Sequence, residues 1–149
     1  MGNFLEPVEL QLNHVRVIVR GMVRVAESDG AHERELVLIR EFYEGCRAEV
    51  AGLADFADVT KGPFDKDEAK EVIDSDQLKV VFLSSCYLVA YADGHVSKEE
   101  ESVLKELAKQ LDISAELESK ARELVKDQLL MQLSRSQNLP ALQKIAKGL

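Results

Sequence analysis

The sequence contains no tryptophan, and only 5% of its 149 residues are aromatic. Because 46% of the residues are nevertheless hydrophobic, we expect a core of leucine, valine, isoleucine and alanine. The length fits one domain over residues 1–149. The sequence has no apolar run long enough to span a bilayer, and no signal-peptide pattern follows Met1. These absences predict a cytoplasmic protein.

Positive charge is also scarce. Lysine and arginine total 19 against 27 aspartates and glutamates, which gives a net charge of −8. Nucleic-acid binding needs a basic surface, so this composition argues against a nucleic-acid partner and favours attraction of cations. Cys46 and Cys86 lack C-x-x-C spacing and lie in apolar helical runs, so buried thiols are favoured over a disulfide.

Strand-like alternation is absent, and helical periodicity predicts an all-α fold of about seven helices. They are expected after Glu6, over Glu33–Leu53, from Asp65 to Ile73, over Leu78–Ala92, after Ser97, after Ser114 and after Pro140. Expected helix caps are Asp65 (a capping box with Glu68), Ser75 or Asp76, Ser97 and Ser114. Thr60, Gly62 and Pro63 mark residues 55–63 as a loop.

Two expected helices have informative faces. The first carries apolar residues on two sides, so it is either central in the fold or part of an oligomer contact such as a homodimer. Its two stripes are Val8, Leu12, Val15, Val19, Met22 and Ala26, and opposite them Leu10, Val17 and Gly21. The second helix has the core stripe Leu36, Ile39, Tyr43, Cys46, Val50 and Leu53.

Three arginines, Arg16, Arg20 and Arg24, follow one side of the first helix at four-residue spacing. In an acidic protein this stripe favours salt bridges with acidic neighbours. The alternative is contact with an acidic partner, or peripheral contact with an anionic membrane surface.

The chain also contains an internal repeat. Asp29-Gly30 and Asp93-Gly94 each follow a helix-like run and open into an acidic turn before a second helix. Glu35 and Glu100 occupy equivalent positions in the second helices if the first turn is one residue shorter. The repeat predicts two helix–DG–helix hairpins related by a pseudo-two-fold axis.

A purely structural interpretation exists for these turns. Glycine after a helix end is a common cap, and Ser97 with Glu100 has capping-box spacing. In the first copy, however, His32 stands three residues before Glu35, so no such box exists there. What the two copies share is therefore the pair of carboxylates.

The second turn has the spacing of the last half of an EF-hand loop, but Val89 and Tyr91 stand where that loop needs oxygen ligands. An EF-hand is therefore excluded. Four carboxylates brought together by the pseudo-two-fold would repel one another unless protonated, solvated or holding a cation. A hard ion such as Ca²⁺ or Mg²⁺ suits such oxygen ligands.

The segment from Tyr91 through Asp93-Gly94 to Glu100, with Leu104, Leu107, Ala108 and Leu111-Asp112-Ile113 behind it, resembles the TerB-like (tellurite-resistance TerB) family. Glu27-Ser28-Asp29-Gly30 with Glu35 and Ile39 is similar to the first repeat of that family, and the resemblance extends from about Val8 to Leu133. It implies an all-helical fold and a divalent-cation site formed by Asp29, Glu35, Asp93 and Glu100. It also implies protein partners in a stress response, often near membranes. The chain lacks the His-Pro-Asp tripeptide of a J-domain, which argues against direct stimulation of a chaperone.

Enzymatic motifs are missing. We find no phosphate loop, no dinucleotide fingerprint and no nucleophile–base pair, and Ser84 and Ser85 have no adjacent histidine. His32 and His95 lack partners at zinc spacing and are interpreted as exposed turn residues. We therefore expect a non-enzymatic sensor or scaffold. The alternative is a metal-dependent hydrolase that uses the same carboxylates.

Overall fold

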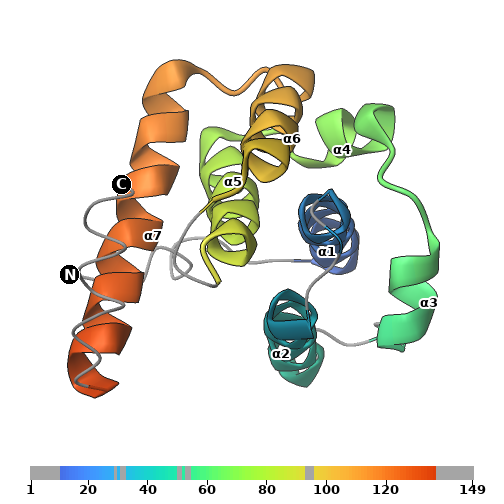
Figure 1. The fold of residues 1–149 in the computed structure, drawn as a ribbon. Helices are drawn as coiled ribbons and strands as arrows, with labels where there is room; N and C mark the ends of the chain where they lie inside the picture. The colour runs from blue at the N-terminus through green and yellow to red at the C-terminus, as the bar shows by residue number, and fades with distance from the viewer. Residues whose placement is uncertain are drawn as a thin grey trace.

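The computed structural model describes residues 11–28, 30, 33–49, 52, 55–92 and 96–136, with the side chains of all but residues 48, 49 and 129–136. All regular secondary structure in these ranges is helical, which confirms the all-α class (Figure 1). The helices are α1 (Leu12–Glu27), α2 (Glu33–Glu49), α3 (Phe56–Lys61), α4 (Lys66–Val72), α5 (Asp76–Ala90), α6 (Lys98–Gln110) and α7 (Ala115–Ser136).

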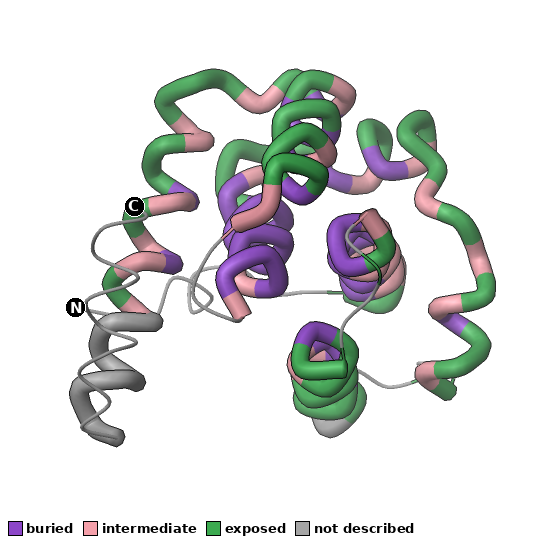
Figure 2. The backbone as a smooth tube through the Cα atoms, in the orientation of Figure 1, coloured by how far each residue is buried: buried purple, intermediate pink, exposed green. Residues whose placement is uncertain are grey.

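The centre of the fold is α5, the helix whose sequence has few polar positions. Eleven of its 15 residues are buried, so it presents buried residues in every direction. It packs against α1, α2, α6 and α7, and its trace in Figure 2 is predominantly purple, the colour of buried residues. The predicted helix over Leu78–Ala92 and its central place are thus confirmed, although it ends two residues earlier, at Ala90.

Both apolar faces of α1 are covered within the chain, except at the predicted stripe member Leu12, which is 37% exposed. Val15 and Val19 are buried on one face, Val17 and Gly21 on the other, and α1 contacts each helix from α2 to α6. The first alternative, a central helix, therefore accounts for both faces. Gly21 permits the close approach of α1 to α5, because a β-carbon there would lie 2.7 Å from the ring of Phe82.

For one residue of α2, the prediction that it belongs to the core is wrong. Ile39 and Tyr43 are buried as expected, but Leu36 is 38% exposed and the adjacent Glu35 is buried in its place. Residues four apart lie on one helix face, so the stripe through Tyr43 and Ile39 continues to Glu35. The predicted members Val50 and Leu53 lie outside the described residues.

The predicted loop over residues 55–63 contains a short helix, α3. Its Phe56 packs against Tyr43 of α2, with ring centroids 5.7 Å apart, and its Val59 is buried. Six residues are too few to show a helical period, and the Thr, Gly and Pro at the end of the segment resemble loop punctuation. Tertiary contacts therefore define this helix.

The predicted caps are confirmed at three serines. Each serine Oγ accepts a hydrogen bond from the amide three residues later: from Leu78 to Ser75, from Glu100 to Ser97 and from Leu117 to Ser114, at 3.1–3.2 Å. Asp65 likewise caps α4 by accepting from the amides of Asp67 and Glu68. The predicted capping box also requires the Glu68 carboxylate to accept from the amide of Asp65. That carboxylate pairs with arginines of α1 instead.

The arginine stripe of α1 forms salt bridges, as the first interpretation predicts. Arg16 and Arg20 lie 3.5 and 3.6 Å from the Glu68 carboxylate of α4, and Arg24 pairs with Glu106 of α6. Arg20 also donates to the carbonyl of Val59 at 3.1 Å. The stripe therefore ties α1 to three neighbouring helices.

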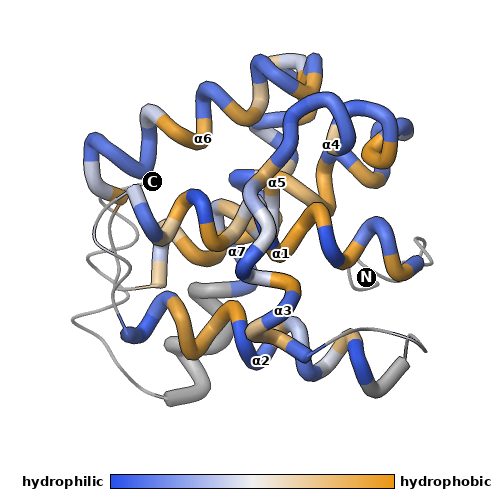
Figure 3. The backbone as a smooth tube through the Cα atoms, turned by 90° about the vertical axis from the view of Figure 1, so that its right-hand side faces the viewer, coloured by the Kyte–Doolittle hydropathy of each residue, from blue (hydrophilic) through white to orange (hydrophobic). Residues whose placement is uncertain are grey.

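Figure 3 shows hydrophilic and hydrophobic residues alternating along α2 and α6, which lie at the surface. Of the described helices, none is both long and apolar enough to cross a bilayer. The predicted helix after Pro140 and the predicted start after Glu6 lie outside the described residues. The described residues form seven helices, as many as expected, but the two sets differ by one helix. The structure includes α3, which was not predicted, in place of the helix expected after Pro140.

Candidate functional site

Glu35 is one of two buried carboxylates in the described chain, and only 2% of its surface is exposed. It lies in the first turn of α2, on the inward stripe that continues to Ile39 and Tyr43. Glutamate is seldom fully buried unless it has a partner. A glutamate at a core position of a helix therefore requires an explanation beyond helix formation.

Glu100 is the second buried carboxylate and is equally 2% exposed. It forms the predicted capping box at the start of α6. Its Oε1 accepts from the amide of Ser97 at 3.0 Å, while its own amide donates to the Ser97 hydroxyl at 3.1 Å. This pairing orients the side chain and satisfies one of its two carboxylate oxygens.

The other oxygen of Glu100, Oε2, is buried and has no hydrogen-bond partner among the described residues. A buried acceptor left unpaired costs at least about 1–3 kcal/mol, and more when it is charged. The capping box therefore accounts for the burial of only one of the two oxygens of this carboxylate. The remaining oxygen has the chemistry of a ligand for a hard cation.

The two aspartates of the repeat, Asp29 and Asp93, lie outside the described residues. The glycine after the first one is described: Gly30 has a φ of +90°, and its amide donates to the carbonyl of Glu27 at 3.3 Å. Glycine tolerates this conformation, so the first turn does use its glycine as a helix stop. Whether the four carboxylates converge stays a prediction.

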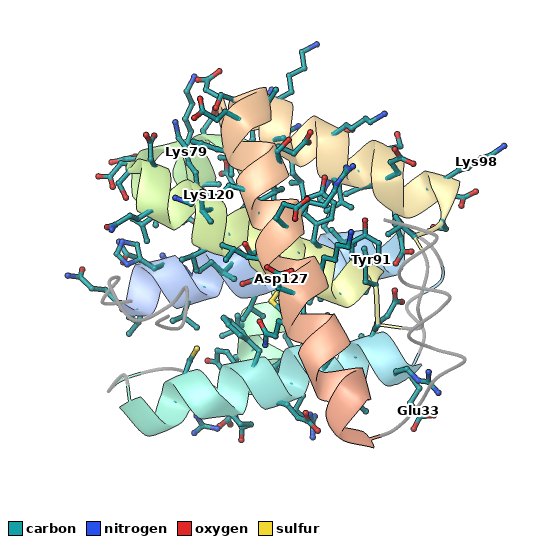
Figure 4. All side chains as sticks on the ribbon, turned by 90° about the vertical axis from the view of Figure 1, so that its left-hand side faces the viewer. Glu33, Lys79, Tyr91, Lys98, Lys120 and Asp127 are labelled. Carbon is teal, nitrogen blue, oxygen red and sulfur yellow. The ribbon has the colours of Figure 1, made fainter. Side chains whose placement is uncertain are left out.

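The two buried glutamates belong to helices that begin at the same side of the molecule. Figure 4 labels Glu33 and Lys98, the first residues of α2 and α6, and both lie toward the same edge of that view. Tyr91, at the end of α5, is labelled at a height between them in the same view, farther from that edge. The arrangement is consistent with the predicted pair of hairpins.

Sequence reasoning missed a cluster of side chains at the end of α5. Tyr87 and Tyr91 stack with ring centroids 5.9 Å apart, and Arg122 of α7 donates to the Tyr87 hydroxyl at 2.9 Å. Burial raises the pKa of Tyr91 to about 12. The four-residue spacing of the tyrosines was visible in the sequence, whereas nothing local marks Arg122. The cluster fixes the end of α5 that precedes the second turn.

The other candidates that the structure describes have no contact that points to a functional role. His14 is half-buried and accepts from the amide of Gln11 at 3.0 Å, while His32 and His95 lie outside the described residues. Cys46 and Cys86 are thiols and form no disulfide. Ser85 donates to the carbonyl of Val81 at 2.8 Å. Within the described ranges, no three His, Cys, Asp or Glu residues gather into a metal site, and two of the four predicted ligands fall outside those ranges.

Comparison with known proteins agrees with the resemblance seen in the sequence. The family model of tellurite resistance protein TerB matches residues 33–123, which is more than half of the chain. The match contains Glu35, Asp93 and Glu100 and begins four residues after Asp29. No curated protein matches the chain, and no solved structure does. On the strength of the family match, the chain belongs to the tellurite resistance protein TerB family.

Proposed function

We propose that this TerB-family domain is a non-enzymatic cation-binding module, a sensor or scaffold in a cytoplasmic stress response. The observation that carries the proposal is the Oε2 oxygen of Glu100, which is buried without a hydrogen-bond partner. A cation at this oxygen would offset the cost of burying an unpaired carboxylate.

The ligand set fits a hard divalent ion. Glu35 and Glu100 offer carboxylate oxygens, and Asp29 and Asp93 stand at corresponding places in the two copies of the repeat. Oxygen ligands favour Ca²⁺ or Mg²⁺ over softer metals. The ion would supply positive charge, and the residues of this chain would hold it between the two hairpins.

Such a site would link ion binding to the fold. Glu100 caps the start of α6 together with Ser97, and Glu35 lies in the first turn of α2. An ion that joins these two carboxylates would connect two helix starts that are 65 residues apart in the sequence. The surfaces of α2 and α6 would then be held in one arrangement, which protein partners in the stress response could recognise.

Calorimetric titration with Ca²⁺, Mg²⁺ and Mn²⁺ tests the proposal. We expect heat of binding for the natural chain and its loss in Glu100→Gln, because glutamine keeps the cap but removes the charged ligand. Glu99→Gln is the matched control: this residue is exposed in the same turn, so binding should persist. If none of these ions produces heat at about millimolar concentration, the proposal is wrong and Glu100 is a capping residue only.

A further inference from the structure

A second polar site lies between α4 and α6, in a cleft of about 420 Å³. Its lining consists of three lysines, two carboxylates and one amide: Lys66, Lys70, Lys109, Asp67, Glu106 and Gln110. Three ammonium groups around one cleft are unexpected in a chain with a net charge of −8. None of these lysines takes part in the acidic site described above.

One of the two carboxylates that line the cleft is already paired. The carboxylate of Glu106 accepts hydrogen bonds from Arg24 and, at 3.3 Å, from Gln110. Lys66 and Lys109 form no ion pair with any carboxylate among the described residues. Positive charge therefore remains available at the rim, with Asp67 as the other acidic group of the lining.

The third lysine is held in place by a partner outside the cleft. The Lys70 ammonium lies 2.8 Å from the carboxylate of Asp112, at the end of α6. Asp112 also accepts, through its backbone carbonyl, a hydrogen bond from Lys79 at 3.4 Å. Lys70 thus bridges α4 and α6, and its position at the cleft is set by this pair.

Lysine ammonium groups are compact point charges with three donors each, and they bind phosphate oxygens well. Their aliphatic stems can cover less polar parts of a ligand. The volume of the cleft lies within the range of small-molecule sites and exceeds the needs of a bare phosphate ion. We propose that this cleft binds the phosphate group of a small soluble phosphate ester.

The probes that test this are glycerol 3-phosphate, inorganic phosphate and glycerol, titrated into the full chain. Binding is followed by calorimetry and by amide chemical shifts. We expect glycerol 3-phosphate to bind and to shift amides of α4 and the end of α6, more weakly as salt increases. Equal affinity for inorganic phosphate would assign recognition to the phosphate group alone, and weaker affinity would add a contribution from the glycerol body. Glycerol itself should not bind.

Variants separate the cleft from general surface charge. Lys66→Gln and Lys109→Gln should each weaken glycerol 3-phosphate binding by about three- to tenfold, since each removes one charged donor. Lys61→Gln on α3 makes the same charge change away from the cleft and should leave affinity unchanged. Glu100→Gln should also leave it unchanged, so this test is independent of the cation proposal. No binding of either phosphate, or equal losses in Lys61→Gln, would overturn the inference.

Discussion

Asp112 occupies an unusual backbone conformation for a residue with a side chain. Its φ is 54°, in the left-handed region that favours glycine, at the residue that follows Leu111, the C-cap of α6. Its amide donates to the carbonyl of Lys109 and the next amide, of Ile113, donates to Ala108, the pairing of a Schellman motif. Aspartate tolerates this conformation better than most residues, and here its carboxylate gains the contact with Lys70.

This pair predicts a measurable pKa change. The hydrogen bond from Lys70 holds the pKa of Asp112 below its ordinary value of 3.8, and the charge of Lys70 adds to the effect. Lys70→Gln should therefore raise the pKa of the Asp112 carboxyl toward that value, as measured by an NMR titration. Lys61→Gln should not change it. An Asp112 pKa that does not respond to Lys70→Gln would show that the pair is not formed in solution.

The sign of the pH dependence follows from the lowered pKa. The charged carboxylate is favoured in the folded chain, so its contribution to stability is complete above pH 3.8 and is lost as the pH falls through the lowered value. Both groups are exposed to solvent, so the contribution should also weaken as salt is added.

At the scale of elements, the close contact between α1 and α5 depends on Gly21, which has no side chain. A β-carbon at Gly21 would lie 2.7 Å from two ring atoms of Phe82 and 3.4 Å from the sulfur of Cys86. Both neighbours are fully buried, so neither has free space into which to move. The sequence showed Gly21 on an apolar face of the first helix but not what it approaches.

Gly21→Ala should therefore destabilise the fold. The added methyl group forces α1 away from α5 or Phe82 out of its position, at a cost of about 1–3 kcal/mol. Denaturant unfolding measures the change. Gly45→Ala is the matched control, because Gly45 is exposed within α2 and a β-carbon there meets nothing within 4 Å. That variant should stabilise the chain by about 0.5–1 kcal/mol, and equal effects at both sites would contradict the packing argument.

At the scale of the whole molecule, one shared ion would make the two hairpins depend on each other. If Ca²⁺ or Mg²⁺ binds only the folded chain, ion at ~100 times its Kd should add about 2.7 kcal/mol to the free energy of unfolding. Thermal melting with added ion, and again after chelation, measures this gain. Asp93→Asn should remove most of it and cost little stability without the ion, because it relieves repulsion between carboxylates.

A double-mutant cycle tests whether the ion is shared. Glu35→Gln and Glu100→Gln should each abolish the ion-dependent gain, and the double variant should lose no more than either single one. Glu33→Gln, at an exposed position in the same turn as Glu35, is the control and should respond like the natural chain. Partial losses that add up in the double variant would instead indicate a separate site in each hairpin.

The sequence by itself determined the helical class, the central helix and most helix starts. The caps at Ser75, Ser97 and Ser114 join atoms of residues three apart, so a short stretch of sequence is enough to predict them. The dense apolar run of α5 can be buried only at the centre of a helical fold. The same local reasoning found Glu100, since its capping box and its place in the repeat are both visible in sequence.

Tertiary structure decided what depends on neighbours. Packing against the core shows that α2 turns Glu35 inward, on the same face as Ile39 and Tyr43, while the apolar Leu36 remains 38% exposed. Pairing across the chain, such as Arg24 with Glu106, is set by how α1 and α6 pack. The cleft between α4 and α6 and the burial of Glu100 Oε2 likewise arise from distant segments. Short spacings encode hydrogen bonds within a helix, but burial and long-range pairing depend on contacts that no local pattern contains.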